Sequence, residues 1–236
     1  MKNLIVFDFD QTIVNTDTDY ELFKLLPEPL YTQFISTDYY SENYTWTEHM
    51  NKFYKLLKQQ GYDINTIKKC LNKFELAPKF KELFNYLQLN KNQYEIYVLS
   101  SACDFSIEYL LNKFNIKNLF DGLLCNKVKE DEENMLILKQ SAIDESCELC
   151  YPNQCKYKLF YDSFNEKINT YNNIIYVCDG GNDFCIARKL NAKDYLMIRK
   201  NYRLDKILNK HNSEVQCKKY KWENGEDIIN ILKTLN

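Results

Sequence analysis

Four aspartates in two short motifs are the residues of this sequence best suited to chemistry. Asp8 and Asp10 stand one residue apart in VFDFDQT, and Asp179 and Asp183 lie within CDGGNDFC. Carboxylates that converge on one place repel one another, so such a set needs a cation. Oxygen ligands without a nearby histidine favour a hard ion such as Mg²⁺ over zinc. These motifs therefore predict a Mg²⁺ site made by Asp8, Asp10, Asp179 and Asp183.

A hydroxyl group, a lysine and two glycines are further candidates. Ser100 follows the apolar run YEIYVL, and Lys156 opens an apparent helix in CYPNQCKYKLF. Gly180 and Gly181 allow a tight turn and a close approach of the backbone to a ligand. A phosphate beside the metal needs a basic partner, and Lys156 is the best placed residue for that role.

Apolar runs of strand length place these side chains. The runs LIVF, YEIYVL, IIYVC and YLMI end at Asp8, Ser100, Asp179 and Arg199 in turn. Continuous runs rich in β-branched and aromatic residues are typical of strands buried on both faces of a parallel sheet. Segments with helical spacing of apolar residues, such as 80–87 and 107–114, lie between them. The alternation predicts a doubly wound α/β sheet that binds ligands beyond the carboxyl ends of its strands.

The segment between the first two strands departs from this alternation. Residues 16–92 contain several helical patterns and no convincing strand, and Pro27 and Pro29 interrupt the first pattern early. We interpret this segment as a helical cap inserted after the first strand. The predicted catalytic core then consists of residues 1–15 and 93–236, and the cap of residues 16–92.

Composition excludes several classes of protein. Of 236 residues, 45% are hydrophobic and 27% are charged, which is typical of a globular protein rather than a disordered one. The net charge of −2 gives no nucleic-acid footprint. The first apolar run is too short for a signal peptide, and no stretch reaches the roughly 20 apolar residues that span a bilayer. An odd number of cysteines, nine, indicates free thiols in a reducing compartment. We expect a cytoplasmic protein without membrane or nucleic-acid partners; the sequence does not predict its oligomeric state.

Each motif taken alone also has a structural interpretation. DFD fits an exposed turn, DGGND fits a hairpin turn, and Lys156 fits a solvated helix surface. An EF-hand loop is a poor fit, because Ile13 occupies the position that needs Gly and Asp19 the position that is usually Glu. The acidic and hydroxyl residues nevertheless follow separate apolar strands in order. That order favours one shared site.

The set resembles the haloacid dehalogenase superfamily of phosphotransferases. DFDQT is similar to its first motif, which implies Asp8 as nucleophile and Asp10 as acid and base. VLSS is similar to the second motif, so Ser100 is expected to bind the phosphoryl group. Lys156 resembles the third motif. DGGND resembles the fourth, in which Asp179 and Asp183 hold Mg²⁺.

Three features narrow the resemblance to the phosphoethanolamine/phosphocholine phosphatase family, which includes a pyridoxal phosphate phosphatase branch. They are DFDQTIVNTDTD with Asp19 eleven residues after Asp8, the cysteine-rich CELCYPNQCK, and YKWENGEDI near the C-terminus. The sequence also departs from this family. Asp-Ala-Asn is usual after the second-motif serine, where this chain has Ser101, Ala102 and Cys103. The usual Gly and Pro around the fourth motif are Cys178 and Ile186.

The resemblance implies a two-step hydrolysis. An ionised Asp8 attacks phosphorus and forms an aspartyl-phosphate, while Mg²⁺ screens its charge. Asp10 needs a pKa above the ordinary value of about 3.9, because it must donate a proton to the leaving alcohol and then take one from water. We expect Thr12, Ser100, Ser101 and Gly180 around the phosphate. Thr12 fits a role in orienting the Asp10 loop and a structural role in the turn equally well.

The expected substrate is a small phosphomonoester, because a cap over the site excludes large molecules. Asp19 and Ser101 are the predicted substrate-binding residues. An amine head group needs acidic partners, and one of the two that the family model implies is Ser101 here. Phosphoethanolamine and phosphocholine are therefore expected to be weaker substrates than in the family, and pyridoxal 5′-phosphate comparatively better. Its flat ring could stack on Tyr39, Tyr40 or Trp46.

Other functions stay open at this point. The substrate could be another phosphometabolite, such as thiamine monophosphate or pyrophosphate, or the chain could be a catalytically silent binder of phosphometabolites. Cys147, Cys150 and Cys155 could also hold a structural zinc ion, but a fourth ligand is missing because His49 and His211 lie far away in the sequence. Packed free thiols are the simpler interpretation of this segment.

Overall fold

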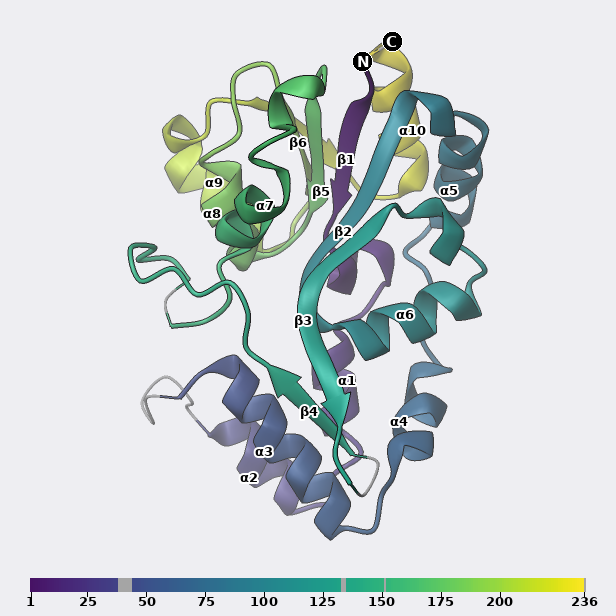
Figure 1. Ribbon diagram of the computed structural model, residues 1–236, viewed down its shortest axis with the longest axis vertical. Coiled ribbons are helices and arrows are strands. Elements are labelled where there is room, and N and C mark those ends of the chain that lie inside the picture. Colours follow the sequence, from purple (N-terminus) through teal and green to yellow (C-terminus); the bar gives the residue numbers. More distant parts are fainter. Residues whose placement is uncertain (38–43, 133–134, 151, 236) are drawn as a thin grey trace.

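A seven-stranded sheet with the order β4-β3-β2-β1-β5-β6-β7 organises the protein (Figure 1). The computed structural model describes residues 1–37, 44–132, 135–150 and 152–235. The strands are β1 (Asn3–Phe7), β2 (Tyr94–Cys103), β3 (Gly122–Glu130), β4 (Leu136–Lys139), β5 (Ile174–Cys178), β6 (Tyr195–Arg199) and β7 (Lys218–Trp222). All neighbouring strands are parallel except β3 and β4. The predicted doubly wound α/β fold is confirmed.

Helices cover both faces of the sheet, and further helices lie beyond the carboxyl end of β1 (Figure 1). They are α1 (Thr18–Phe23), α2 (Leu30–Ser36), α3 (Trp46–Gln59), α4 (Ile64–Leu71), α5 (Phe80–Leu89), α6 (Asp104–Lys113), α7 (Lys156–Phe164), α8 (Phe184–Ala187), α9 (Arg203–His211) and α10 (Gly225–Thr234). Two short helical turns lie within the aspartate motifs. They are η1 (Phe9–Ile13), directly after Asp8, and η5 (Gly181–Asp183), within DGGND.

Strand β1 shows why the core has two halves. Its five residues are all buried, and their side chains alternate between the faces of the sheet. Ile5 and Phe7 belong to the apolar cluster that includes α5, α6 and α10, whereas Leu4 and Val6 belong to the cluster that includes α7, α8 and α9. Figure 1 shows these two groups of helices on opposite sides of the strands. The continuous LIVF run is therefore the signature of a strand buried on both faces.

Helices α1 to α4 lie beyond the carboxyl end of β1, where the tip of β3 and strand β4 reach them (Figure 1). Asn51 on α3 fixes this contact, because its side chain donates to the Leu138 carbonyl at 3.1 Å and accepts from the Leu138 amide at 2.8 Å. Helix α5, which the sequence places in the cap, packs against α10 and contacts Phe7 through Phe80 and Phe84. The division into core and cap at residues 16–92 stays a prediction.

Ser100 and Arg199 were both expected directly after the end of a strand, and both instead lie within the strand. Strand β2 does not end before Ser100 but continues to Cys103, with a shift of register against β3 between Leu99 and Cys103. Arg199 is the last residue of β6 rather than the residue after it. Lys156, by contrast, is the first residue of α7, as the sequence indicates.

Candidate active site

The carboxyl ends of β1 and β5 bring three of the predicted aspartates together. Within the described residues, one carboxylate oxygen each from Asp8, Asp179 and Asp183 lies within 4.8 Å of the other two, and all three side chains are buried. The parallel register of Phe7 and Val177 places Asp8 and Asp179 at the same level of the sheet. Asp183 comes back to them because η5 turns the chain directly after Gly180.

Lys156 is the cation of this cluster. Its side chain is 1% exposed, and its Nζ lies 2.8 Å from Asp8 Oδ1 and 2.5 Å from Asp183 Oδ1. Burial disfavours the charged amine, but the two carboxylates outweigh that effect and raise the pKa of Lys156 above its usual value. Lys156 is therefore a fixed positive charge at the base of the site.

Asp183 is held by more groups than any other residue of the cluster. Its Oδ1 accepts from Lys156 and from the Tyr176 hydroxyl, both at 2.5 Å, and its Oδ2 accepts from the Gly180 amide at 2.7 Å. Tyr176 stands on β5, and sequence reasoning did not identify it. With these partners, Asp183 orients Lys156 and the Gly180 turn, while Asp8 and Asp179 keep oxygens for a ligand.

The electrostatics of Asp8 and Asp179 favour a bound cation. Burial, and then repulsion from Asp183, raise the pKa of Asp8 to about 7, although Lys156 opposes the shift. Burial, followed by repulsion from Asp8 and Asp183, raises the pKa of Asp179 to about 8. Each of the two uses only one of its oxygens in these contacts with protein donors. Asp8 Oδ1 accepts from Lys156 and the Phe9 amide, and Asp179 Oδ1 accepts from the Thr12 hydroxyl at 3.1 Å.

The donor set fits Mg²⁺. Oxygen ligands at about 2.1 Å from an octahedral ion lie about 3 to 4 Å apart, so the carboxylate oxygens need only a small closure around the ion. All three donors are oxygens, and a dication would remove the repulsion that raises the pKa values of Asp8 and Asp179. Asp8 and Asp179 are the residues of this cluster best placed to bind the ion directly.

Asp10 lies apart from this cluster. Its Oδ1 accepts from the Thr18 amide at 2.9 Å and its Oδ2 accepts from the Thr18 hydroxyl at 3.1 Å. Burial, followed by the charges of Asp17 and Asp19, raises the pKa of Asp10 well above its usual value. A carboxyl group whose pKa is raised holds its proton to a higher pH than an ordinary aspartate and is better suited to act as a general acid. The sequence indicates the raised pKa but not its main causes.

The loop that carries Asp10 is fixed by Arg199, the last residue of β6. Gln11 adopts a left-handed conformation (φ 52°, ψ 13°), and its carbonyl accepts from Arg199 Nη1 at 2.5 Å. The guanidinium also donates to Asn15 Oδ1 at 2.5 Å and packs over the rings of Tyr202 and Trp222. Arg199 is thus a positioning residue that sequence reasoning noted only as the end of a strand.

Ser100, Ser101 and Gly180 line one cavity of about 380 Å³ together with Asp8, Asp10, Asp19 and Asp179. Ser100 Oγ accepts from the Ala102 amide at 3.1 Å, which leaves its hydrogen to donate. The Ser101 carbonyl accepts from Asn126, whose side chain also receives hydrogen bonds from Ser141 and Gln154. Thr12 is fully buried beneath Asp179 and is not among the cavity-lining residues.

The opposite side of the cavity comes from α1, α3 and the loop before α7. Trp46 Nε1 donates to Asp19 Oδ2 at 2.9 Å, and the Trp46 amide donates to Asn153 Oδ1 at 2.6 Å. Tyr20 lies beside Trp46 with ring centroids 5.8 Å apart. Burial, followed by the charge of Asp17, raises the pKa of Asp19 to about 7. Tyr39 and Tyr40, the other aromatic residues predicted here, lie outside the described residues.

Comparison with known proteins identifies the family. The model of a family described as "Putative Phosphatase" matches residues 3–236. The chain belongs to this family. It is 30% identical to pyridoxal phosphate phosphatase PHOSPHO2 of Bos taurus, over all of this chain and 99% of that protein. It is 27% identical to the phosphoethanolamine/phosphocholine phosphatase of Gallus gallus, over 99% of this chain and 89% of that protein.

A solved structure supports the same fold. A substrate-bound phosphoserine phosphatase superimposes with a TM-score of 0.65 at 16% identity, covering 99% of this chain and 98% of that one. The protein is a phosphatase, that is, a phosphoric monoester hydrolase, and the predicted phosphatase family is confirmed. Its fold is that of solved haloacid dehalogenase hydrolases, one of which superimposes with a TM-score of 0.66 at 16% identity. Within the described residues, no helix has the length and apolar character needed to cross a bilayer.

Proposed function

We propose that the protein is a Mg²⁺-dependent phosphatase of small phosphomonoesters, with pyridoxal 5′-phosphate as its preferred substrate and an aspartyl-phosphate on Asp8 as its intermediate. The observation that carries this proposal is the buried group of Asp8, Asp179, Asp183 and Lys156 on one side of a cavity of about 380 Å³. The two ion pairs of Lys156 align Asp8, and the cavity has the size of a small-molecule site.

Mg²⁺ bound by Asp8 and Asp179 would supply positive charge to the phosphoryl oxygens and lower the pKa of Asp8. The protein performs the remaining tasks with its own residues. Lys156 holds Asp8 by Oδ1, which leaves Oδ2 as the attacking atom. A bond forms between Oδ2 and phosphorus as the bond from phosphorus to the leaving oxygen breaks.

Other residues stabilise the charge of the phosphoryl group and transfer the protons of the two steps. The Ser100 hydroxyl and the turn from Gly180 to Asn182 line the cavity, and the hydroxyl can donate to a phosphoryl oxygen. Asp10, held by Thr18 at both oxygens, gives its proton to the leaving oxygen. In the second step the ionised Asp10 takes a proton from water as the water attacks phosphorus, which frees Asp8 and phosphate.

The wall formed by the cap helices supports pyridoxal 5′-phosphate. Trp46 and Tyr20 offer aromatic surface to a flat ring. Gln154 lines the same cavity, and its Oε1 is buried and accepts no hydrogen bond from the described residues, so it can accept one from a hydroxyl or ring N–H of the substrate. The PHOSPHO2 relatives carry the name pyridoxal phosphate phosphatase, which agrees with this choice.

Phosphate release from a panel of substrates tests the proposal. The panel contains pyridoxal 5′-phosphate, phosphoethanolamine, phosphocholine, thiamine monophosphate and inorganic pyrophosphate, the last because a relative of Arabidopsis thaliana is named inorganic pyrophosphatase 2. We expect the highest kcat/KM for pyridoxal 5′-phosphate with Mg²⁺ present. Release no faster than that of an Asp8→Asn variant would refute the enzymatic proposal, and a preference for another substrate would refute its specificity.

Acid quenching of a reaction in progress tests the intermediate. Mass spectrometry of the digested protein should find phosphate on the peptide that contains Asp8. A wild-type enzyme that turns over rapidly and carries phosphate on no peptide, or on another residue, would contradict the assignment of Asp8.

A further inference from the structure

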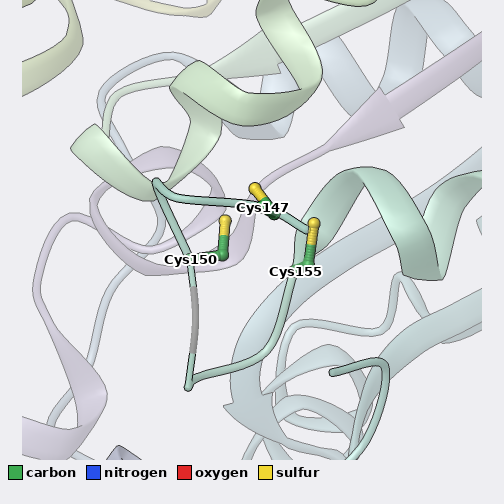
Figure 2. Close-up of side chains that lie close together, drawn as sticks. All are labelled: Cys147, Cys150 and Cys155. Atoms are coloured by element: carbon green, nitrogen blue, oxygen red, sulfur yellow. The ribbon is translucent and has the colours of Figure 1, made fainter. Parts of the chain in front are cut away.

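Three cysteine side chains converge in the loop between β4 and α7. Figure 2 shows the sulfur atoms of Cys147, Cys150 and Cys155 on the same side of this loop. The three sulfur atoms lie within 4.8 Å of one another. Cys150 and Cys155 are buried, whereas Cys147 is partly exposed. The loop therefore presents three thiols to a single point that is open at one side.

A fourth cysteine, from a distant part of the chain, packs against two of these three, although its sulfur atom is not among those that all lie within 4.8 Å of one another. Cys185 on α8 forms one buried cluster with Cys150 and Cys155, and its thiol interacts with both of theirs. Its Sγ also lies 3.5 Å from the Asn182 carbonyl. The C-x₂-C-x₄-C segment lacks this ligand in sequence, and the fold supplies it.

We propose that Cys147, Cys150, Cys155 and Cys185 bind one structural Zn²⁺ ion. Tetrahedral zinc with sulfur ligands at about 2.3 Å separates the sulfur atoms by about 3.8 Å. The thiols of the loop need to close by about 1 Å at most to reach that geometry. Four thiolates fill the coordination sphere and leave no position for water, so this ion has no part in the phosphatase chemistry.

Sulfur is a soft ligand, so four cysteine side chains gathered at one place suit a soft dication that all four can bind at once. Cys147, being partly exposed, provides the route by which the ion enters.

The position of the cluster indicates what the ion stabilises. Cys155 immediately precedes Lys156, and Cys185 follows Asp183 by two residues. Zinc would therefore join the two segments that carry the 2.5 Å ion pair between Lys156 and Asp183. The same loop holds Asn153, which binds the first residue of α3, so the ion would also steady this contact with the cap helices.

Metal analysis of the wild-type protein is the first test. The protein is purified under reducing conditions without chelator or a histidine tag, and its zinc content is measured by mass spectrometry with thiol titration in parallel. We expect about one zinc ion per chain and thiols that become reactive only after unfolding or chelation. A zinc-free chain with these four thiols reduced, or a disulfide between two of them, would overturn the proposal.

Matched variants locate the ion. Cys147→Ser changes the partly exposed ligand and should lower the zinc content while the protein stays folded; Cys185→Ser should do the same from the other segment. Cys217→Ser, at a buried cysteine outside the cluster, is the control and should keep the ion. Zinc that persists in both Cys147→Ser and Cys185→Ser would refute the assignment.

Cobalt substitution and an active-site variant separate this site from the carboxylates. Co²⁺ in the wild-type protein should show the visible absorption of a tetrahedral thiolate site, and that absorption should disappear in Cys147→Ser. Asp179→Asn should keep the zinc and the Co²⁺ spectrum. If Asp179→Asn instead removes the zinc, the ion belongs to the carboxylate site and the proposal fails, whatever the fate of the phosphatase activity.

Discussion

The two walls of the cavity are built in different ways. On the core side, the carboxyl groups follow strands of a parallel sheet and are tied to fixed donors: Asp183 alone accepts from Lys156, Tyr176 and Gly180. On the side that the sequence assigns to the cap, Asp19 comes from α1 and Trp46 from α3, and a hydrogen bond of 2.9 Å joins them. The core wall is charged and held by buried ion pairs, whereas the cap wall presents the aromatic rings of Tyr20 and Trp46 to the cavity.

This difference separates chemistry from specificity. Groups that transfer a phosphoryl unit must keep their positions within a fraction of an ångström, which a buried sheet edge provides. Groups that select the rest of the substrate tolerate more variation. Changes on the core wall should therefore abolish turnover, and changes on the cap wall should alter stability or the ratio between substrates.

The largest effect is expected at the core wall, from Asp8→Asn. The amide keeps the shape of the side chain but is a poor nucleophile, so kcat should fall by a factor on the order of 10³ or more. Steady-state hydrolysis of an aryl phosphate measures this loss, and circular dichroism checks the fold. Asp162→Asn, at an exposed residue of α7, is the matched control and should keep full activity. Activity above a few per cent in Asp8→Asn would place the nucleophile elsewhere.

Removal of the metal should have the next largest effect. Without a dication, Asp8 and Asp179 repel each other and the phosphate, so EDTA should reduce the rate by on the order of a hundredfold. Mg²⁺ should restore the rate, and Ca²⁺ should not, because its longer bonds and higher coordination number disturb the in-line geometry. Restoration by Mg²⁺ alone attributes the effect to the carboxylate site rather than to the cysteine cluster. Full activity in excess EDTA would contradict the Mg²⁺ site.

A smaller effect is expected at the cap wall from Asp19→Asn. The pKa of Asp19 is about 7 in the folded protein against an ordinary 3.8. Between these values the folded state holds a proton that the unfolded state releases, so the free energy of unfolding decreases as pH rises from about 4 to 7. Asparagine still accepts from Trp46 and carries no charge. The change in the free energy of unfolding caused by Asp19→Asn should therefore be more favourable at pH 8 than near pH 4, by on the order of 2 kcal/mol.

Urea denaturation of both proteins at pH 4.5 and pH 8 measures this difference without substrate. Asp63→Asn is the control, because Asp63 is an exposed N-cap whose pKa is lowered by the Thr66 amide, the opposite direction. The stability of that variant should show no gain at high pH. Equal stability changes in Asp19→Asn at both pH values would mean that Asp19 is ionised at low cost.

The same contrast explains what could be predicted from the sequence. Asp8 and Asp179 follow apolar runs directly, so the pattern of buried strands places them at one edge of the sheet. Tyr176 supports the site from the middle of β5 and Arg199 from the last position of β6, and nothing in the sequence distinguishes these two from other strand residues. Cys185 joins its cluster across 29 intervening residues, and spacing rules search only nearby positions.

The extent of the predicted cap was harder to derive from the sequence for a related reason. Helix α5 has the same apolar spacing as the cap helices, but its apolar face packs on α10 and Phe7. Periodicity shows that a helix has an apolar face and does not show which partner covers it. Strand β4 and the long β3 also join the cap side, although they come from a later part of the chain.

The smallest expected effect concerns Ser101→Asp. Ser101 lines the cavity near Asn182, with Asn182 Nδ2 at 3.4 Å from its hydroxyl, and stands on the β2 extension that runs toward the cap. A carboxylate here would give an ammonium head group a second acidic partner beside Asp19. One such partly buried ion pair contributes on the order of 1–2 kcal/mol, which is roughly a tenfold change in kcat/KM. The ratio of kcat/KM for phosphoethanolamine to that for pyridoxal 5′-phosphate should rise by about this factor, while Ser101→Asn, which adds similar bulk without charge, should leave it unchanged. A ratio that is the same in Ser101→Asp and in the wild type would show that substrate selection depends on the helices of the cap wall alone.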